Sequence, residues 1–559
     1  MNPDSRIIVG LGGSNHEGSA ALLREFSIEV AIEQERVTRR KHGNSWWWEN
    51  PVGAAVEYCL ESTDVSIDDV GRFVSSDLLP KRVIEQYQPK CVRLYPHHLC
   101  HAASVCLLLP PKSKAAFLVY DGMGSIRSEP AGGKVLRETF SFFESTDSGL
   151  RCLGQTLGES LVEHDDFPSG CSNSIGKIYD MVTAILGFDE SDAGKTMGLA
   201  AHGTPRYAED IMRYIRLTPD LSSCFEFDAS DPSLSNFLKK RISTSREFSV
   251  KADIAASVQS VLERTLLHAS SLLTGEYDFL CVSGGCALNS VANGLLAQQL
   301  PVGLQLMVPP FAADSGLAFG ALWLDRLSEL GEWPILSMRC APITPRASRP
   351  GRHYGVDRCR AAAQRYYPSL SLDPAVHDAA TLASRLASGS VIGFFNGPSE
   401  IGPRALGGRS IFADPRSVLM RERINRSIKL REPFRPLAPM ILEERYDDYF
   451  EDRRCADPYM LRVAKATHRC YELAPAVVHV DGTARVQTIG SNDDQFLREL
   501  LIAFENITGV PMLINTSFNR RGEPIVETPE DALDAFFGMN LNGLYMDGVF
   551  FVHPNEEAI

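Results

Sequence analysis

Three histidines in the segment YPHHLCHAAS have the types and spacing of metal ligands. His97 and His101 are four positions apart, so on a helix they share one face, while His98 points elsewhere. Asp121 ends an apolar strand in VYDGMG, and Asp314 precedes a predicted helix in PPFAADSGLAFG. Two imidazoles and two carboxylates suit iron, zinc or manganese. The alternative is that the histidines are ordinary helix residues and the aspartates close a turn or cap a helix.

Two further segments favour an anionic ligand. In SGGCALN, Ser283 to Asn289, two glycines between a strand and a helix let the backbone approach a phosphate, although a plain turn is the alternative. Arginines in GPRALGGRSIFADPR and the residues after it can bind phosphate bidentately. We interpret the following set as a pocket for a polyphosphate and a small anion: Arg404, Arg409, Arg416, Lys429, Arg431, Arg435, Arg485, Asn515 and Ser517. A solvated basic face is the alternative.

Two isolated features are also chemically suggestive. His16 follows the glycine loop of GGSNHEGSAALL, where an imidazole is suited to act as a general base or simply to close a turn. The run Trp46 to Trp48 is suited to stack on a sugar or macrocycle, or to form a hydrophobic contact between domains or subunits.

A mixed α/β framework is expected to position these residues. RIIVGLGG predicts a buried strand that runs into a glycine turn, followed by two strands of a meander and a helix in PVGAAVEYCLEST. AAFLVYDGMGS and VLRETFSFFES repeat the strand-to-glycine pattern faintly, which indicates two similar halves. The Pro-, Arg- and Gly-rich stretch from Arg339 to about Pro368 is the best linker candidate.

The composition limits the class of protein. The 559 residues are too many for one core, and a net charge of −14 gives no reason to expect nucleic acid or an anionic membrane as partner. Thirteen scattered cysteines without a C-x-x-C pair favour reduced thiols, and we see no signal peptide or membrane span. We therefore expect a cytoplasmic protein of at least two domains.

The ordered motifs resemble those of one enzyme family, the O-carbamoyltransferases, which include the tobramycin and nodulation-factor enzymes. The matches run in order from about residue 7 to residue 533. They comprise HEGSAALL, HHLCHAAS, YDGMG, AGKTMGLAAHG, SGGCALN, ADSGLAFGA, GPRALGGRSIFADPR, KLREPFRPLAP, DGTARVQ and NTSFNRRGEPIVETPEDAL. Each motif alone is moderately specific, whereas the ordered set is very specific.

The resemblance implies two domains and two half-reactions. Residues 1–345 would form an actin-like, duplicated ribonuclease-H-like domain with a metal site, and residues 346–559 a YrdC-like domain. The second domain would convert carbamoyl phosphate and ATP, with Mg²⁺, into carbamoyl-adenylate. The first would transfer the carbamoyl group to a hydroxyl of a small natural product such as an antibiotic, toxin or glycoside. Relatives also suggest a homodimer.

The resemblance assigns roles to individual residues. His97, His101, Asp121 and Asp314 match metal ligands that are usually assigned to iron(II), and His16 matches a histidine near the acceptor hydroxyl. The nucleotide-binding side of the first domain corresponds to Gly122, Lys195, Gly284, Gly285 and Asn289. The phosphates of the second domain correspond to Arg404, Arg409, Lys429, Arg431, Arg435, Arg485, Asn515 and Ser517.

Three other functions remain open at this point. A threonylcarbamoyl-type tRNA-modifying enzyme is disfavoured by the acidic charge and by the absence of a clear RNA-binding patch. A carbamoyl-phosphate or nucleotide sensor on a degenerate scaffold would be expected to have lost part of the metal set or the arginine set. A zinc peptidase would rest on the histidine pair alone, without an H-E-x-x-H motif.

Overall fold

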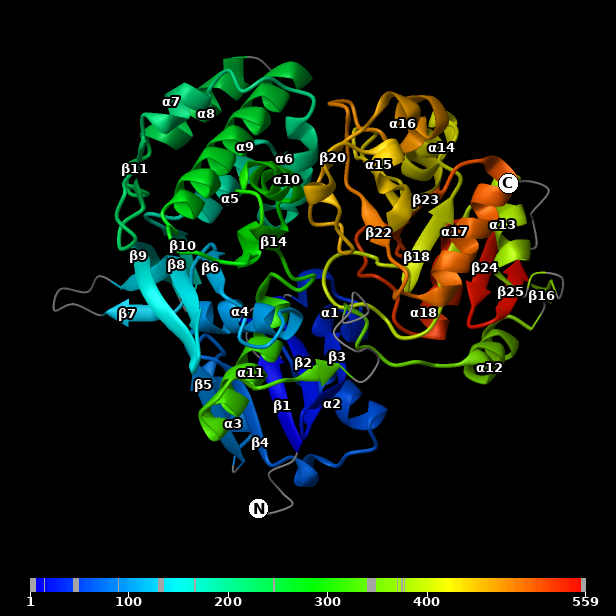
Figure 1. The fold of residues 1–559 in the computed structure, drawn as a ribbon, viewed down its shortest axis with the longest axis horizontal. Coiled ribbons are helices and arrows are strands. Elements are labelled where there is room, and N and C mark those ends of the chain that lie inside the picture. The colour runs from blue at the N-terminus through cyan, green and yellow to red at the C-terminus, as the bar shows by residue number, and fades with distance from the viewer. Residues whose placement is uncertain are drawn as a thin grey trace. The chain divides into compact units, whose positions relative to one another are not determined.

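A computed structural model gives the fold. It describes residues 7–14, 16–43, 50–88, 90–128, 135–164, 167–244, 247–338, 348–368, 370–373, 376 and 378–553. The chain divides into two compact units (Figure 1). Unit 1 comprises Met1–Asn15 and Gly71–Leu336, and unit 2 comprises His16–Val70 and Ser337–Ile559.

Unit 1 contains two sets of three parallel strands. In the first set, β4 (Arg72–Ser76) pairs with β1 (Ile7–Gly12) and with β5 (Cys91–Tyr95). In the second set, β13 (Phe279–Ser283) pairs in the same way with β6 (Ala115–Tyr120) and with β14 (Gln305–Met307). Antiparallel strands extend the second set into a sheet of order β10-β9-β8-β6-β13-β14, with β7 on β8. The added strands are β7 (Ile126–Ser128), β8 (Leu136–Thr146), β9 (Gly149–His164) and β10 (Phe167–Cys171).

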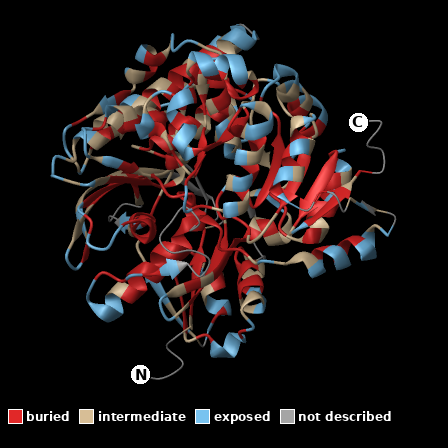
Figure 2. Cartoon of the chain, turned by 45° about the vertical axis from the view of Figure 1, so that its right-hand side comes forward, coloured by how far each residue is buried: buried red, intermediate tan, exposed pale blue. Residues whose placement is uncertain are grey.

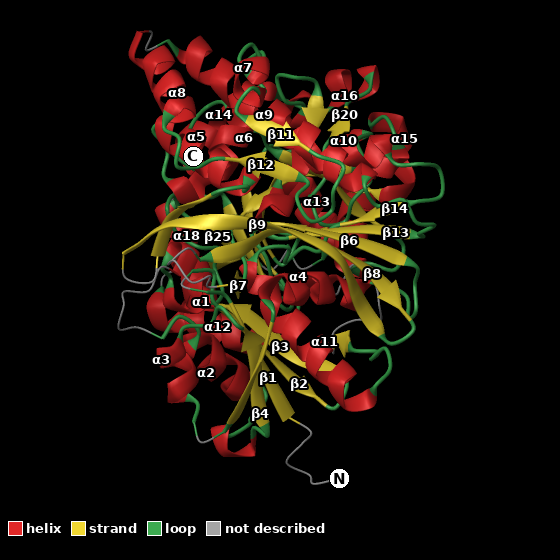
Figure 3. Cartoon of the chain, turned by 90° about the vertical axis from the view of Figure 1, so that its left-hand side faces the viewer, coloured by secondary structure: helices red, strands yellow, loops and turns green. Residues whose placement is uncertain are grey.

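Helices cover both faces of this seven-stranded sheet (Figure 3). On one face, α4 (His97–Val105) contacts β6 and β13, and α11 (Leu317–Leu330) packs against α4 and against β1 and β4. The other face carries a helical layer around the long helix α9 (Phe248–Ser271), which contacts α5 (Ile175–Ile185) and α6 (Ala193–Ala200). The remaining elements of unit 1 are α3 (Lys81–Gln86), α7 (Ala208–Met212), β11 (Ile215–Leu217), β12 (Phe225–Phe227), α8 (Ser233–Thr244) and α10 (Ser290–Gln299).

Unit 2 is built on an eight-stranded mixed sheet of order β16-β25-β24-β17-β18-β23-β19-β22. Its strands are β16 (Ser371–Leu372), β17 (Ile392–Phe395), β18 (Arg409–Ala413), β19 (Ala438–Leu442), β22 (Gln487–Ile489), β23 (Met512–Ser517), β24 (Gly543–Met546) and β25 (Val549–Val552). Its helices are α12 (Val356–Tyr366), α13 (Ala379–Ala387), α14 (Val418–Arg423), α15 (Tyr446–Tyr449), α16 (His468–Leu473), α17 (Gln495–Thr508) and α18 (Pro529–Gly538). The short strands β20 (Ala464–Lys465) and β21 (Thr483–Ala484) form a separate pair.

The segment 16–70 belongs to unit 2. It contributes the antiparallel strands β2 (Ser19–Arg24) and β3 (Ser27–Glu33), with helices α1 (Gln34–Thr38) and α2 (Gly53–Ser62), and β15 (Ser337–Met338) pairs with β3. Buried polar contacts attach it to the C-terminal part of the unit. Arg36 donates to the carbonyl of Gly402 at 2.7 Å, and the Tyr58 hydroxyl donates to Glu527 at 2.5 Å. Figure 2 shows buried residues following the strands and the inner sides of the helices.

The mixed α/β class and the predicted strands and helices are confirmed. The order of strands along the chain is in line with the predicted internal repeat. The antiparallel pair β2 and β3 follows β1, and the antiparallel pair β8 and β9 follows β6. The compact units do not coincide with residues 1–345 and 346–559, because residues 16–70 group with the C-terminal part. The assignment of those two ranges to actin-like and YrdC-like folds stays a prediction.

Two further expectations concern parts of the chain that the structure describes incompletely. Trp46 to Trp48 lie outside the described residues, as do residues 339–347 of the linker candidate. Among the helices that are described, none combines the length and the apolar composition that a membrane span requires.

Candidate metal centre and anion-binding cluster

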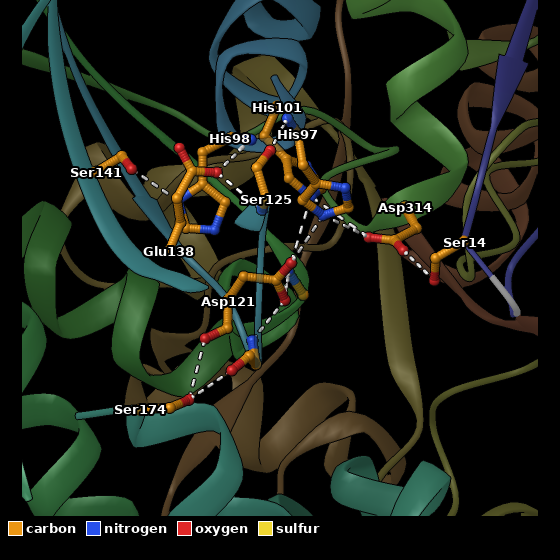
Figure 4. A network of polar contacts seen from close by, with 12 residues as sticks. Ser14, His97, His98, His101, Asp121, Ser125, Glu138, Ser141, Ser174 and Asp314 are labelled. Carbon is orange, nitrogen blue, oxygen red and sulfur yellow. Dashed lines mark hydrogen bonds and ion pairs between the residues drawn. The ribbon is translucent and has the colours of Figure 1, made fainter. Parts of the chain in front are cut away.

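The two histidines and two aspartates of the predicted metal set meet in unit 1 (Figure 4). His97 and His101 occupy the buried first turns of α4, and their Nε2 atoms face the same two carboxylate oxygens. The Nε2 atom of His97 lies 3.3 Å from Asp121 Oδ2 and 3.5 Å from Asp314 Oδ1, and that of His101 lies 3.4 Å from each. All four ligand atoms lie within 4.8 Å of one another. The helical spacing of the histidines, the turn after β6 and the turn before α11 thus build one buried four-residue cluster.

Each carboxylate is held by its other oxygen. Asp121 Oδ1 accepts hydrogen bonds from the backbone N–H groups of Gly122 at 2.7 Å and Gly285 at 3.2 Å. Asp314 Oδ2 accepts from the Ser14 hydroxyl at 3.1 Å. These bonds leave one oxygen of each aspartate directed at the histidines, which is how outer partners orient the ligands of a metal.

The helix that carries the histidines is capped by residues distant in sequence. Pro96 stands at the N-cap and supplies no side-chain hydrogen bond. Instead, the Ser125 hydroxyl accepts from the backbone N–H of His97 at 2.7 Å and donates to Asp77 at 2.6 Å. The buried carboxylate of Glu138 accepts from the backbone N–H of His98 at 3.4 Å. These tertiary caps satisfy donors at the N-terminus of α4 and fix the start of the helix.

The electrostatics of the cluster favour ion pairs or a bound cation. Burial disfavours a charged imidazole, yet the attraction of Asp314 and hydrogen bonds to both aspartates outweigh it and raise the pKa of His97 to about 10. Burial also opposes the charge on Asp314, but His97 and His101 hold the pKa of that carboxyl well below its usual range. The two aspartates thus stabilise positive charge at the position of the histidine nitrogens, as the carboxylates of a cation site do.

The donor set fits a divalent transition metal. Two imidazole nitrogens and two carboxylate oxygens form the mixed N/O set that suits iron(II), zinc or manganese. The Nε2 atom of His101 is buried without a hydrogen-bond partner, although both carboxylates stand 3.4 Å away. That orphaned atom is the one that a bound cation would satisfy. Within the described residues, no other group of histidine, cysteine and acidic side chains has this arrangement.

His98 stands outside the cluster, as its helical position predicts. Its Nδ1 atom is 2.8 Å from the Ser141 hydroxyl, and burial lowers its pKa to about 4. A Cβ atom on Gly124 would come within 2.5 Å of its ring, so the turn after β6 must carry a glycine there. His98 is therefore a packed, uncharged neighbour of the ligands.

The glycine turns predicted for a nucleotide lie beside Asp121. Gly284 has a φ of 95° and a Cβ atom on it would approach the Tyr120 carbonyl to 2.4 Å, so only glycine fits the turn. Asn289 caps α10 through a hydrogen bond from Ala292 N–H at 3.0 Å, and its amide pairs with that of Gln259. The cap accounts for Asn289 structurally, and the nucleotide-binding roles of these residues stay predictions.

Lys195 is engaged elsewhere. Its Nζ atom lies 2.6 Å from Asp192 and 5.7 Å from the centre of the Phe188 ring. The lysine beside Gly122 is Lys177, which the sequence analysis missed. Lys177 lies in the segment SNSIGKIYD, where Ser174 indicates only the start of a helix. Nothing in that segment points to a ligand, so there was no reason to select the lysine from the sequence.

Most of the predicted phosphate-binding residues form one basic cluster in unit 2. Burial, followed by repulsion from Arg435, lowers the pKa of Arg404 to about 10 and that of Arg431 to about 9. Burial, followed by repulsion from Arg404, Arg431 and Arg435, holds the pKa of Arg485 well below its usual value. The Nε atom of Arg485 is also buried without a hydrogen-bond partner. Partly desolvated cations that repel one another are stabilised by a polyanion.

Lys429 joins this cluster from the end of a π-helical turn, Ile424–Ile428. Its ammonium group donates to four oxygens of two residues: the carbonyl and hydroxyl of Ser517 at 2.8 and 3.3 Å, and the carbonyl and side-chain oxygen of Asn519 at 2.8 and 2.7 Å. Burial, with repulsion from Arg431, Arg435 and Lys41, lowers the pKa of Lys429. The structure thus connects the predicted Lys429 and Ser517, and adds Lys41 to the surroundings of the cluster.

Arg409, Asn515 and Arg416 are placed differently from the other members of the predicted set. The fully buried Arg409 guanidinium stacks on Phe395 at 3.6 Å and donates to the Gly397 carbonyl at 2.9 Å. Asn515 donates to Gln487 at 2.7 Å and to the Ala405 carbonyl at 3.1 Å. Arg416 is bound by Asp414 at 2.6 Å. These contacts differ from those of the basic cluster, and the phosphate-binding roles of the three residues stay predictions.

His16 is exposed and belongs to unit 2, whereas the four-residue cluster belongs to unit 1. Its role as a base near the acceptor stays a prediction. Ser14, Ser125 and Glu138 were not anticipated, because their contacts with the metal set arise from folding. The proline before His97 does indicate that the helix must be capped from elsewhere, but not by which residue.

Comparison with known proteins identifies the family. The family model for the carbamoyltransferase N-terminus matches residues 82–323, and that for the C-terminus matches residues 383–553. Nodulation protein NolNO of Sinorhizobium fredii is 31% identical over 95% of this chain and 78% of that protein. Nodulation protein NolO of Bradyrhizobium diazoefficiens is 35% identical over 74% of each chain.

Among solved structures, full-length HypF in a phosphate- and nucleotide-bound form aligns with a TM-score of 0.38 and 14% identity, over 58% of this chain and 47% of that one. The two family models and the relatives that match most of the chain confirm the resemblance predicted from the ordered motifs. The chain belongs to the carbamoyltransferase family of enzymes.

Proposed function

We propose that the protein is an ATP-dependent O-carbamoyltransferase. In the first half-reaction, carbamoyl phosphate, ATP and water give carbamoyl-adenylate, pyrophosphate and phosphate. In the second, the carbamoyl group passes to a hydroxyl of a small natural product, and AMP leaves. Adenylation is needed because a carbamate is a poor electrophile, and AMP is a much better leaving group than hydroxide.

The observation that carries the proposal is the basic cluster of unit 2. Arg404, Arg431 and Arg485 have pKa values lowered by burial and by mutual repulsion, so the fold holds them together at a cost. Binding of a polyphosphate relieves that repulsion and supplies acceptors for the donors, including the orphaned Nε of Arg485. ATP and carbamoyl phosphate are anions of this kind, with Mg²⁺ as the usual companion of ATP.

The buried cluster of unit 1 suits the transfer step. A divalent metal such as iron(II), held by His97, His101, Asp121 and Asp314, would supply Lewis acidity toward the carbamoyl group. Gly122 and Gly285 hold Asp121 in place through their backbone N–H groups. His16 is proposed to take the proton of the acceptor hydroxyl as it attacks.

The proposal is tested by pyrophosphate release from ATP in the presence of carbamoyl phosphate and Mg²⁺. Arg485→Ala should reduce the rate by about tenfold or more, since a hydrogen bond to a charged group contributes about 1.5–3 kcal/mol. Arg416→Ala is the matched control, because Arg416 is bound by Asp414. Equal rates for wild type and Arg485→Ala would count against phosphate binding at this cluster.

A further inference from the structure

Three turns of unit 1 approach one another beside Asp121. A Cβ atom on Gly176 would lie 3.1 Å from Gly122 Cα and 2.9 Å from Cys286 Sγ. A Cβ atom on Gly285 would lie 3.0 Å from Asp121 Oδ1. The three turns are therefore packed closely together beside Asp121, and glycine at Gly176 and Gly285 lets the backbones approach one another there.

The first turn of α5 is fixed to the same place. The Ser174 hydroxyl accepts from the backbone N–H of Lys177 at 3.2 Å and donates to the Gly122 carbonyl at 2.8 Å. A serine that caps α5 thus also connects it to the residue after Asp121. The backbone of this first turn is consequently tied to the residue that follows the candidate metal ligand Asp121.

Lys177 extends from this turn over Gly122. A Cβ atom on Gly122 would lie 3.4 Å from Lys177 Cε and 3.8 Å from its Nζ. Its ammonium is 3.3 Å from Asp180 Oδ2, and the two side chains are 25% and 31% exposed. An ion pair of that length and exposure is weak and easily exchanged for a better acceptor. Lys177 is therefore a cation that a ligand can recruit.

Lys195, the lysine that the family resemblance suggested, is less available. Its contact with Asp192 is 2.6 Å, and its ammonium also faces the ring of Phe188. Both of these partners lie within residues 188–192, just before α6. The two lysines are thus alternatives for one role, and the geometry distinguishes them.

We propose that Lys177 binds the phosphate of the adenylate in unit 1 while the carbamoyl group is transferred. The inference rests on the proposed function. In that step the acceptor oxygen forms a bond to the carbamoyl carbon, and the bond from that carbon to the phosphate oxygen breaks. The electron pair stays on the phosphate of the departing AMP, and the acceptor proton goes to the base. An ammonium at the phosphate stabilises the negative charge that develops there.

AMP is the probe, because it carries the phosphate without needing an acceptor. Its binding is measured by calorimetry in full-length protein with Ser517→Ala, which weakens the proposed unit 2 site. In that background Lys177→Ala should weaken AMP binding about 10- to 100-fold, the equivalent of a charge-assisted hydrogen bond. Lys177→Arg should retain most of the affinity. Lys251, whose ammonium donates to the Leu186 carbonyl at 2.8 Å, provides the matched control Lys251→Ala.

The outcomes separate the possibilities. A loss confined to Lys177→Ala supports the assignment. A loss with Lys195→Ala but not with Lys177→Ala overturns it in favour of the other lysine. Equal losses in the three alanine variants of Lys177, Lys195 and Lys251, or no AMP binding in the background protein, overturn it as well. Circular dichroism checks that each variant is folded. Pyrophosphate release by the wild-type protein tests the proposed function separately. If adenylation is absent, that assay shows it, whereas the AMP titrations show whether Lys177 binds the phosphate.

Discussion

Removal of the Ser125 hydroxyl tests whether the tertiary cap of α4 positions the metal ligands. Ser125→Ala removes the acceptor of the His97 N–H at 2.7 Å and the donor to Asp77 at 2.6 Å, in a buried environment. A buried N–H without a partner costs about 1–3 kcal/mol. We expect the first turn of α4 to shift so that the His97 N–H reaches water, which moves His97 away from the other ligands. Metal affinity should then fall by about 10- to 100-fold, since about 1.4 kcal/mol corresponds to a factor of ten.

The assay is a competition titration of the metal-free protein with Zn²⁺ and a chromophoric chelator. Ser141→Ala is the matched control, because it removes an equally buried hydroxyl, 2.8 Å from the Nδ1 atom of His98, which is not in the ligand set. We expect Ser125→Ala to lose affinity and Ser141→Ala to keep it. Unchanged affinity in Ser125→Ala, or the same loss in both variants, would refute the reasoning.

Three further predictions concern the two units. Asp314→Asn should abolish stoichiometric binding of a divalent metal, measured by elemental analysis after dialysis, because one anionic ligand of four is lost; full occupancy would contradict the ligand set. Although burial opposes the charge, Asp314 and hydrogen bonds to both aspartates raise the pKa of His97 to about 10, against about 6.5 in the unfolded chain. Chelator-treated folded protein should therefore bind the extra proton between these pH values. The melting temperature should therefore fall as pH rises from about 6.5 towards 10, and fall less in His97→Asn; parallel curves would contradict this. Tyr58→Phe removes a buried donor to Glu527 and should destabilise unit 2 by about 1.5–3 kcal/mol in urea unfolding, whereas an unchanged midpoint would show that the contact is dispensable.

The parts of the site that depend on local order could be predicted from sequence. The four-residue spacing of His97 and His101 fixes their common face once the segment is helical, and Asp121 is marked by the end of an apolar strand. That Asp314 joins them depends on packing between distant segments. The sequence offered Asp314 only as a candidate carboxylate before a helix, and the family resemblance matched it to a metal ligand.

The parts that depend on tertiary packing could not be predicted. Lys177 and Lys195 both follow a glycine within a helix, and only the contact with Gly122 distinguishes them. Arg409 has the residue type of a phosphate ligand, but it starts the buried strand β18 and stacks on Phe395. The grouping of residues 16–70 with unit 2 depends on contacts such as that of Arg36 with Gly402, which leave no local signal.

Isotope exchange between ATP and pyrophosphate tests the central claim most directly, because it needs no acceptor. The protein is incubated with ATP, labelled pyrophosphate, carbamoyl phosphate, Mg²⁺ and iron(II), beside a Ser517→Ala variant that removes an oxygen partner of Lys429. We expect exchange that requires carbamoyl phosphate and decreases in the variant. No exchange from protein that binds nucleotide and metal would contradict adenylation, and with it carbamoyl transfer by this route.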